Sequence, residues 1–285
     1  MANTVAAGLI LDTLGKRTKT TLGNVFAPIG AFASDCTEEP LTQGQRVQVP
    51  LASAGATAQT NPTNWESGDS TIDNIGVTVA QYSVSFHITP LQLNNNFRLQ
   101  QLIDINLQSF VNKVQDVVMS PFAGVNFANF IEAQATFSST NLKSLWASIA
   151  KSPVKNLILD STAYANFLPG SLTTEIGPKP GLAGFDNVFL NTRWTGAGTN
   201  VYGFVGGSQS VAYVAGVPMI DDETKADINC TIISVPLANG AAVPVMASTW
   251  LSRATRTRWA SWDIMLGASK LDNSGGKMIK SGGGA

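Results

Sequence analysis

The chain has 285 residues, of which 13% are charged, about half of the ~25% that is usual for soluble globular domains. Its 18 basic and 19 acidic residues leave a net charge of −1, which excludes tight electrostatic binding to a nucleic-acid backbone. The long uncharged runs are interrupted by proline, glycine and asparagine, which excludes a membrane span. We therefore expect other protein to cover much of its surface.

Residues 1–40 are predicted to form an arm with one short helix, from Asn3 to Leu14, because Gly23, Pro28 and Gly30 interrupt the segment that follows. Alternation of polar and apolar residues then predicts two strands, Arg46–Leu51 and Val77–Ile88. In the second strand, one face is apolar (Tyr82, Val84, Phe86, Ile88) and the other is polar (Gln81, Ser83, Ser85, His87). The long polar connection, with Trp65 as its only aromatic residue, predicts a protruding hairpin with a functional tip.

Apolar residues spaced by three and four from Leu99 to Val118 predict a long helix, from Leu91 to Met119, that ends before Pro121. Such a helix would be roughly 40 Å long. The spacing persists for fewer than three heptads, which disfavours the alternative of a coiled coil.

In the segment 136–240, short helical and strand patterns alternate, which predicts a mixed α/β domain. Its expected helices are Asn141–Ala150, a helix capped by Asp160 or Ser161 that runs to Leu168, and one near Ser208–Ala215. Its expected strands are Leu157–Leu159, Val188–Leu190 and Val201–Val205. In the first helix, we expect four side chains to point inward: Leu142, Leu145, Trp146 and Ile149.

Beyond Gly240 the sequence is extended again. Apolar Ala260, Trp262, Ile264 and Leu266 alternate with Ser261, Asp263 and Met265, which predicts a strand. This strand has no partner next to it in the sequence, so we expect it to return to the unit built by the earlier strands and the long helix. The glycines from Gly275 to Gly284 predict a flexible end.

Residues for catalysis are scarce, so we expect no enzyme, cofactor or metal site. The single histidine, His87, lies on a polar strand face and is expected to be solvated or at an interface. Cys36 and Cys230 have no zinc or disulfide spacing, and the acidic run Asp221–Glu223 is expected to be a solvated turn. Three arginines either bind phosphate or form ion pairs between subunits, and their forked donors favour the second alternative: Arg253, Arg256 and Arg258.

The order of arm, hairpin, long helix, α/β domain and returning strand resembles the tailed-bacteriophage major capsid protein family. The stretches that carry this resemblance are Val77–Val118, Leu157–Tyr164, Val211–Pro218, Arg258–Asp263 and Gly267–Leu271, within about residues 41–280. The resemblance implies an α+β tailed-phage capsid fold with these parts: N-terminal arm 1–40, extended loop hairpin 41–80, peripheral domain with spine helix 81–135, axial domain 136–240, and return with C-terminal tail 241–285.

The resemblance also implies a function. The chain would form pentamers and hexamers of an icosahedral virion shell around double-stranded DNA, assembled in the bacterial cytoplasm, with a portal as partner and no membrane. The hairpin would lie over a neighbouring copy, which makes Trp65 a contact candidate. An encapsulin-like shell around cargo enzymes shares this fold and is the alternative, and an enzyme is the third class.

Two departures from the family pattern limit what the resemblance implies. No long charged helical segment precedes Pro40, so we expect a separate scaffolding protein or an already removed propeptide. No lysine occurs between Lys19 and Lys113, so we expect no covalent link through a lysine of the extended loop.

Overall fold

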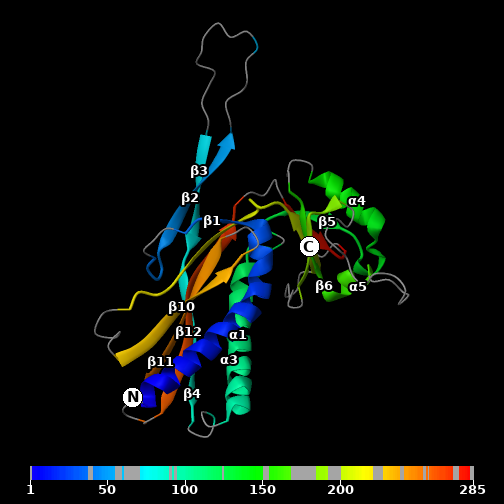
Figure 1. The fold of residues 1–285 in the computed structure, drawn as a ribbon. Coiled ribbons are helices and arrows are strands. Elements are labelled where there is room, and N and C mark those ends of the chain that lie inside the picture. Colours follow the sequence, from blue (N-terminus) through cyan, green and yellow to red (C-terminus); the bar gives the residue numbers. More distant parts are fainter. Residues whose placement is uncertain are drawn as a thin grey trace.

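In a computed structural model of the chain, the described residues are 2–37, 41–54, 60, 71–89, 92, 95–123, 125–149, 154–167, 184–191, 200–220, 227–237, 241–252, 255, 257–271 and 276–282. They form two sheets that carry helices, and a two-stranded hairpin that projects from them (Figure 1). The α+β class predicted from the sequence is confirmed.

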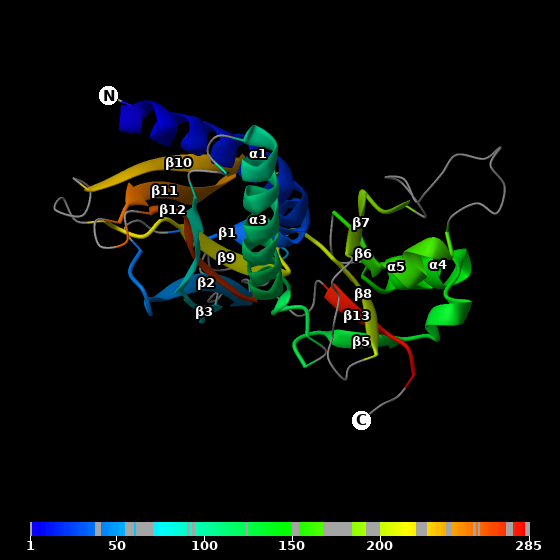
Figure 2. The ribbon, with the colours of Figure 1, turned by 90° about the horizontal axis from the view of Figure 1, so that it is seen from below.

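The larger sheet has the order β1-β9-β12-β11-β10, and β4 also pairs with β12. Its strands are β1 (Ala33–Asp35), β4 (Ala80–Ile88), β9 (Val211–Gly216), β10 (Ile228–Pro236), β11 (Ala242–Leu251) and β12 (Arg258–Lys270). Two helices, α1 (Ala2–Phe32) and α3 (Asn96–Met119), lie over the same face of this sheet (Figure 2). Their apolar stripes and the apolar face of the sheet form the main core.

The stripe predicted for the long helix is confirmed in α3. The residues of the stripe, from Leu99 to Val118, are buried in the main core or packed against it, whereas Ile105, which lies off the stripe, is exposed. The helix ends at Met119 as predicted. The predicted start at Leu91 is wrong. Asn95 has an extended backbone and its side chain accepts a 3.2 Å hydrogen bond from the Arg98 N–H, so it caps the helix and fixes the first residue as Asn96.

The first helix is much longer than predicted, because it continues beyond Leu14 to Phe32. A buried position recurs every four residues, at Ile10, Leu14, Thr18, Leu22 and Phe26. Polar Thr18 interrupts this stripe in the sequence, but its hydroxyl donates to the Leu14 carbonyl at 2.7 Å and accepts from the Trp262 indole N–H at 2.8 Å. Packing against the sheet therefore outweighs the helix-breaking glycines and the internal proline.

Replacing Thr18 with valine is expected to lower the free energy of unfolding by about 1–3 kcal/mol. Valine keeps the shape of the side chain but leaves the fully buried indole N–H of Trp262 without its acceptor. Urea unfolding of unassembled subunits measures the change. The control is Thr20→Val, where an exposed hydroxyl that bonds to the Lys16 carbonyl is removed, and an equal loss in both variants would contradict the interpretation.

The hairpin consists of β2 (Arg46–Ala54) and β3 (Thr71–Thr78), paired antiparallel from Arg46 opposite Thr78 outward. The predicted first strand is confirmed, whereas the predicted second strand is divided at Val79, whose N–H donates to the Gln45 carbonyl at 2.9 Å. Beyond this point β4 enters the larger sheet with the predicted faces: its apolar residues face the core, and the polar ones are exposed. The hairpin tip lies outside the described residues.

The smaller sheet has the order β5-β13-β8-β6-β7. Its strands are β5 (Ala128–Ile131), β6 (Asn156–Asp160), β7 (Asn187–Asn191), β8 (Val201–Gly206) and β13 (Gly276–Lys280). Alongside it lie η1 (Gln134–Thr136), α4 (Ser139–Ser148) and α5 (Ser161–Ala165). The three strands predicted for segment 136–240 are confirmed in β6, β7 and β8.

The helix predicted near Ser208–Ala215 is wrong, because Val211–Gly216 is strand β9 of the larger sheet. All its residues are buried between β1 and β12, and a short apolar run does not distinguish such a strand from a buried helix. β10 also lies in the larger sheet, whereas β5 and β13 come from outside 136–240 and complete the smaller one. The predicted boundaries at 135 and 240 therefore do not match the division between the sheets.

The expectation of a flexible glycine-rich end is wrong for Gly276–Lys280, which forms the buried strand β13 between β5 and β8. A Cβ atom on Gly276 would lie 2.6 Å from the Phe204 ring. The glycine is therefore explained by close packing. Residues 283–285 lie outside the described part of the chain.

Of the four side chains expected to point inward from the first helix of this segment, Leu142, Leu145 and Ile149 are buried in a second core. Trp146 is 39% exposed, contrary to the prediction. Its indole N–H donates to the Gly184 carbonyl at 2.9 Å, and the ammonium of Lys155 lies 3.4 Å from its ring centre, a cation–π contact. Trp146 therefore covers a buried lysine at the margin of this core.

Asp160 caps α5 as predicted, since its side chain accepts from the Ala163 N–H at 2.7 Å. The helix ends at Ala165, earlier than predicted, and Leu168 lies outside the described residues. An aromatic cluster joins the two sheets: Phe204 of β8 lies 5.4 Å from Phe32, 4.7 Å from Phe122 and 4.8 Å from Phe127 between ring centres. None of the described helices combines the length and the apolar character needed to cross a membrane.

Candidate functional site

On the second face of the larger sheet, the part formed by β4, β11 and β12 carries polar residues and no described helix (Figure 2). The part of this face that contains Ala212, Val214 and Met265 is apolar and packs against the hairpin base. Three rows of paired residues cross β11, β12 and β4 on this face: Trp250–Trp259–His87, Ser248–Ser261–Ser85 and Met246–Asp263–Ser83. We call these nine residues the polar face. Their neighbours along each strand, such as Ala247, Trp262 and Phe86, point into the main core on the other side, as the two-residue period of a strand requires.

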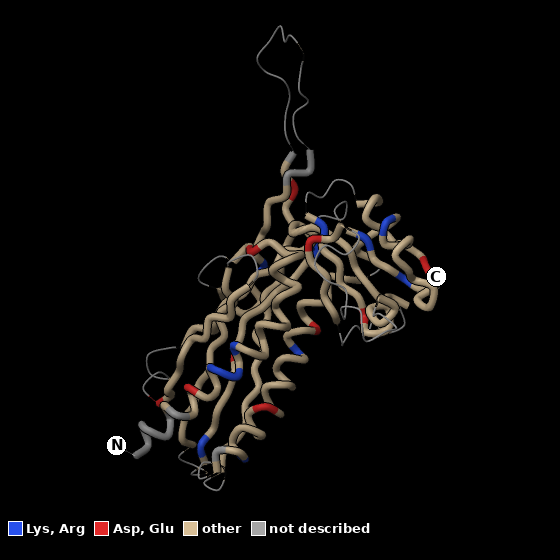
Figure 3. The backbone as a smooth tube through the Cα atoms, turned by 45° about the vertical axis from the view of Figure 1, so that its right-hand side comes forward, with Lys and Arg blue, Asp and Glu red and all other residues tan. Residues whose placement is uncertain are grey.

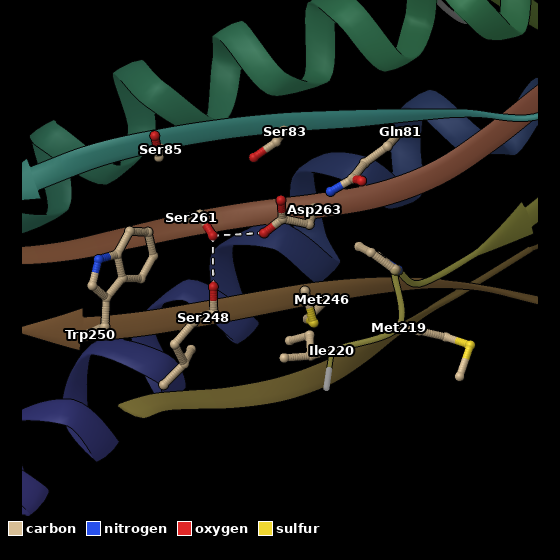
Figure 4. A pocket seen from close by; sticks show the side chains of 12 residues that line it. Gln81, Ser83, Ser85, Met219, Ile220, Met246, Ser248, Trp250, Ser261 and Asp263 are labelled. Atoms are coloured by element: carbon tan, nitrogen blue, oxygen red, sulfur yellow. Dashed lines mark hydrogen bonds between the residues drawn. The ribbon is translucent and has the colours of Figure 1, made fainter. Parts of the chain in front are cut away.

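A pocket of about 380 Å³ lies on the polar face. Its floor is formed by β11 and β12, one side by Gln81, Ser83 and Ser85 of β4, and the other by the segment Pro218–Ile220 (Figure 4). The volume is within the range of small ligand sites. It is large enough for one long side chain or a molecule of similar size.

A chain of hydrogen bonds crosses the pocket floor. The hydroxyls of Ser248 and Ser261 are 2.7 Å apart, and the Ser261 hydroxyl donates to Oδ2 of Asp263, also at 2.7 Å (Figure 4). Asp263 is only 8% exposed, and within the described part of the chain it takes part in no ion pair. The pocket therefore contains one buried carboxylate that no described basic residue of its own subunit neutralises.

Aromatic rings continue the polar face beyond the pocket. Trp250 and Trp259 stack with their ring centres 6.3 Å apart and an interplanar angle of 12°, and His87 lies 5.8 Å from Trp259. The expected place of His87 on an exposed strand face is confirmed. Aromatic residues are enriched at protein interfaces relative to the rest of the surface.

The hairpin leaves the larger sheet where its base crosses β12. A Cβ atom on Gly267 of β12 would collide with the carbonyl oxygen of Thr78, the last residue of β3. A third apolar cluster fixes this base, with Val47, Val77, Val79 and Met265 among its members. The position of the hairpin thus depends on the absence of a side chain at residue 267.

Replacing Gly267 with alanine is expected to loosen the hairpin base while the main core stays folded. The added methyl group would contact backbone atoms, which cannot turn away as a flexible side chain can. Hydrogen exchange of the amides in β2 and β3 should become faster in Gly267→Ala and stay unchanged in the control Gly23→Ala, where the new methyl group meets open space. Unchanged exchange in both variants would contradict the role of Gly267.

Of the four predicted contact residues, three lie outside the described residues: Trp65, Arg253 and Arg256. Arg258 is the first residue of β12, is buried, and lies between Leu251 of β11 and Ile88 of β4. Its pairing with a neighbouring subunit stays a prediction. The acidic run 221–223 also lies outside the described residues, and within the described part no group of histidine, cysteine or acidic residues could hold a metal ion.

Sequence reasoning recognised the alternation in β12 but missed Asp263 as a site residue. Its signal was available, because Asp263 is the only charged residue between Arg258 and Lys270, the two ends of this strand. The contribution of Ser248 and of segment 218–220 had no such signal, since it depends on the register between β11 and β12 and on the path of the chain after β9.

Charged residues are thinly spread along the described part of the chain (Figure 3). The ion pairs found there join Lys16 to Asp12 at 2.8 Å and Arg17 to Asp104 at 3.6 Å, both on the helix side of the sheet. Exposed pairs of this kind contribute little to stability. The polar face therefore presents hydroxyls and aromatic rings around one acidic residue.

No protein-family model matches the chain, and no curated protein matches its sequence. Solved structures, however, share its fold over most of both chains. The capsid of the native GTA particle is 12% identical with a TM-score of 0.57, covering 92% of this chain and 91% of its own. The virus-like particle from Pyrococcus furiosus is 9% identical with a TM-score of 0.56, covering 97% and 98%.

The capsid of the cyanophage P-SCSP1u is 11% identical with a TM-score of 0.54, covering 88% of this chain and 87% of its own. At such low identity the likeness establishes the fold and nothing further. The chain thus has the fold of shell-forming capsid subunits. More particularly, this is the fold of tailed-phage major capsid proteins that the sequence resemblance implied.

Proposed function

We propose that this chain is the major capsid protein of a tailed phage, and that its copies assemble as pentamers and hexamers into an icosahedral shell around double-stranded DNA. The observation that carries the proposal is a capsid-subunit fold, shared over 92% of the chain with the GTA capsid, together with a projecting hairpin. The role is structural, and no catalytic activity is part of it.

A sheet edge with which no described strand pairs supports assembly. β10 is an outer strand of the larger sheet and has no charged residue from Ile228 to Pro236. Its Ile232 side chain is 60% exposed. Free edges without charges or covering elements tend to pair with other chains, so this edge is suited to burial against a neighbouring copy.

Within this proposal, Trp65 in the hairpin tip and the arginines 253, 256 and 258 contact neighbouring copies. A portal, a separate scaffolding protein and the enclosed genome are the further partners. Because the net charge is close to zero, the DNA would be enclosed by the shell with little electrostatic attraction from this chain.

The contents of the particles test this proposal against the encapsulin-like alternative. Particles purified from the native host should contain long, nuclease-protected double-stranded DNA. Particles that contain a stoichiometric enzyme and no DNA would contradict the proposal and favour a cargo compartment. Both classes share the fold, so the contents and not the shape of the particle decide between them.

A further inference from the structure

We propose that the pocket on the polar face receives a lysine or arginine side chain from a second copy of this chain, which neutralises Asp263. This inference rests on the proposed function, because it needs two copies in contact. It assigns to the pocket a ligand class, a cationic side chain, and a partner, the neighbouring subunit.

The first argument is charge. Burying a carboxylate costs free energy unless a cation and hydrogen bonds compensate it. Asp263 is 8% exposed, and its hydrogen bond with a described residue is the one donated by Ser261 to Oδ2. Among the described residues of the free subunit, the charge is therefore compensated by this hydrogen bond and by no cation, whereas a guanidinium or ammonium group in the pocket would pair with it.

The second argument is the chemistry of the walls. Ser83, Ser85 and Gln81 provide uncharged oxygen atoms along one side of the pocket (Figure 4). Pro218 and Ile220 on the other side, and Met246 of β11 in the floor, add apolar groups to the lining. Lysine and arginine have an apolar stem and a cationic, hydrogen-bond-donating end. Such a side chain matches both the walls and the floor.

The third argument concerns which cation fills the pocket. No described lysine or arginine of the same subunit pairs with Asp263, and the hairpin from Leu51 to Gly76 contains no basic residue. We therefore assign the occupant to a part of the neighbouring copy other than the segment from Leu51 to Gly76. The rim suits a protein partner, because Met219 is 77% exposed beside the pocket.

The variant Asp263→Asn tests this inference through opposite effects on subunit and shell. Asparagine can still accept the Ser261 hydrogen bond but carries no charge. Free subunits, held below the assembly concentration, should keep or raise their denaturation midpoint. Shells should weaken: the free-subunit concentration in equilibrium with them should rise about tenfold or more, as for loss of a buried interfacial charge pair.

The matched control is Asp12→Asn, which removes the same charge from an exposed residue on the helix side. Equal weakening of shells by both variants would overturn the inference, because net charge would then explain the effect. Shells that tolerate Asp263→Asn, or free subunits that lose as much stability as the shells, would also overturn it. Failure of the unaltered chain to form any shell would instead overturn the proposed function, and this inference with it.

A double-mutant cycle identifies the partner residue. Each of the 18 basic residues is replaced by glutamine in wild-type and Asp263→Asn shells, beginning with Arg253 and Arg256. For the true partner, the glutamine replacement should weaken wild-type shells and have little further effect when Asp263 is already neutral. If no basic residue shows this coupling, a cationic side chain does not fill the pocket.

Discussion

Val114→Asp is expected to give insoluble protein. Val114 is fully buried in the main core, on the stripe of α3 that faces the larger sheet. An unpaired charge there costs several kcal/mol, about 3–5, which is comparable with the whole stability of many domains. The soluble fraction after expression and the far-ultraviolet circular dichroism of any soluble protein measure the effect.

The control for this variant is Ser109→Asp, which places the same charge on the exposed side of the same helix. We expect it to change the free energy of unfolding by less than about 0.5 kcal/mol. Soluble, folded Val114→Asp protein would show that this helix is not a core element. Insolubility of both variants would show that the helix tolerates no added charge on any face.

Deletion of residues 60–67 is expected to abolish shell formation while the subunit stays folded. The hairpin strands pair with each other and are anchored at their base by a separate apolar cluster, so the main core does not depend on the tip. In the proposed shell the tip contacts a neighbouring copy, and its removal leaves that contact unmade. Thermal unfolding tests the fold, and sedimentation velocity tests assembly.

The two variants should therefore have different defects: Val114→Asp should lose solubility, whereas the deletion of residues 60–67 should lose only shell assembly. If the deletion lowers solubility as much as Val114→Asp does, the hairpin tip is part of the folding unit and its assignment to assembly is wrong. Shells that form normally without the tip would also contradict the assignment of the hairpin tip to assembly.

Periodicity predicted the elements that have one buried face. The stripe from Leu99 to Val118 and the alternation in β4 are direct consequences of half-burial, and these elements are confirmed. The alternation in β12 is also confirmed, although both faces of this strand are largely buried. The return of β12 to the earlier strands is also confirmed, although β11, which is adjacent in sequence, is a further partner. Here local pattern and tertiary structure agree.

Elements that depend on contacts with residues distant in the sequence could not be predicted from the local sequence pattern. The buried stripe of α1 includes the polar residue Thr18. Its hydroxyl is accommodated there because it accepts a hydrogen bond from Trp262, which is distant in the sequence. β9 is buried on both faces, so its sequence shows no alternation of polar and apolar residues. Gly276 looked like a linker residue because the Phe204 ring that explains it is contributed by another strand.

In the candidate site, too, some residues could be predicted from local pattern and others depended on tertiary contacts. The polar row of β4, with Ser83, Ser85 and His87, was visible in the sequence, and it forms one side of the polar face. Asp263 could be recognised as a site residue only from the structure, because the registers of β11, β12 and β4 place it beside Ser261 in a pocket. The sequence therefore indicated a polar strand face, and the structure located a buried carboxylate within it.

Electron microscopy of the purified chain tests the central proposal most directly. Expressed with its scaffolding protein and concentrated, the chain should form closed icosahedral shells in which pentamers and hexamers are resolved. A stable monomer at high concentration, even with the scaffolding protein supplied, would contradict the assignment as a major capsid protein.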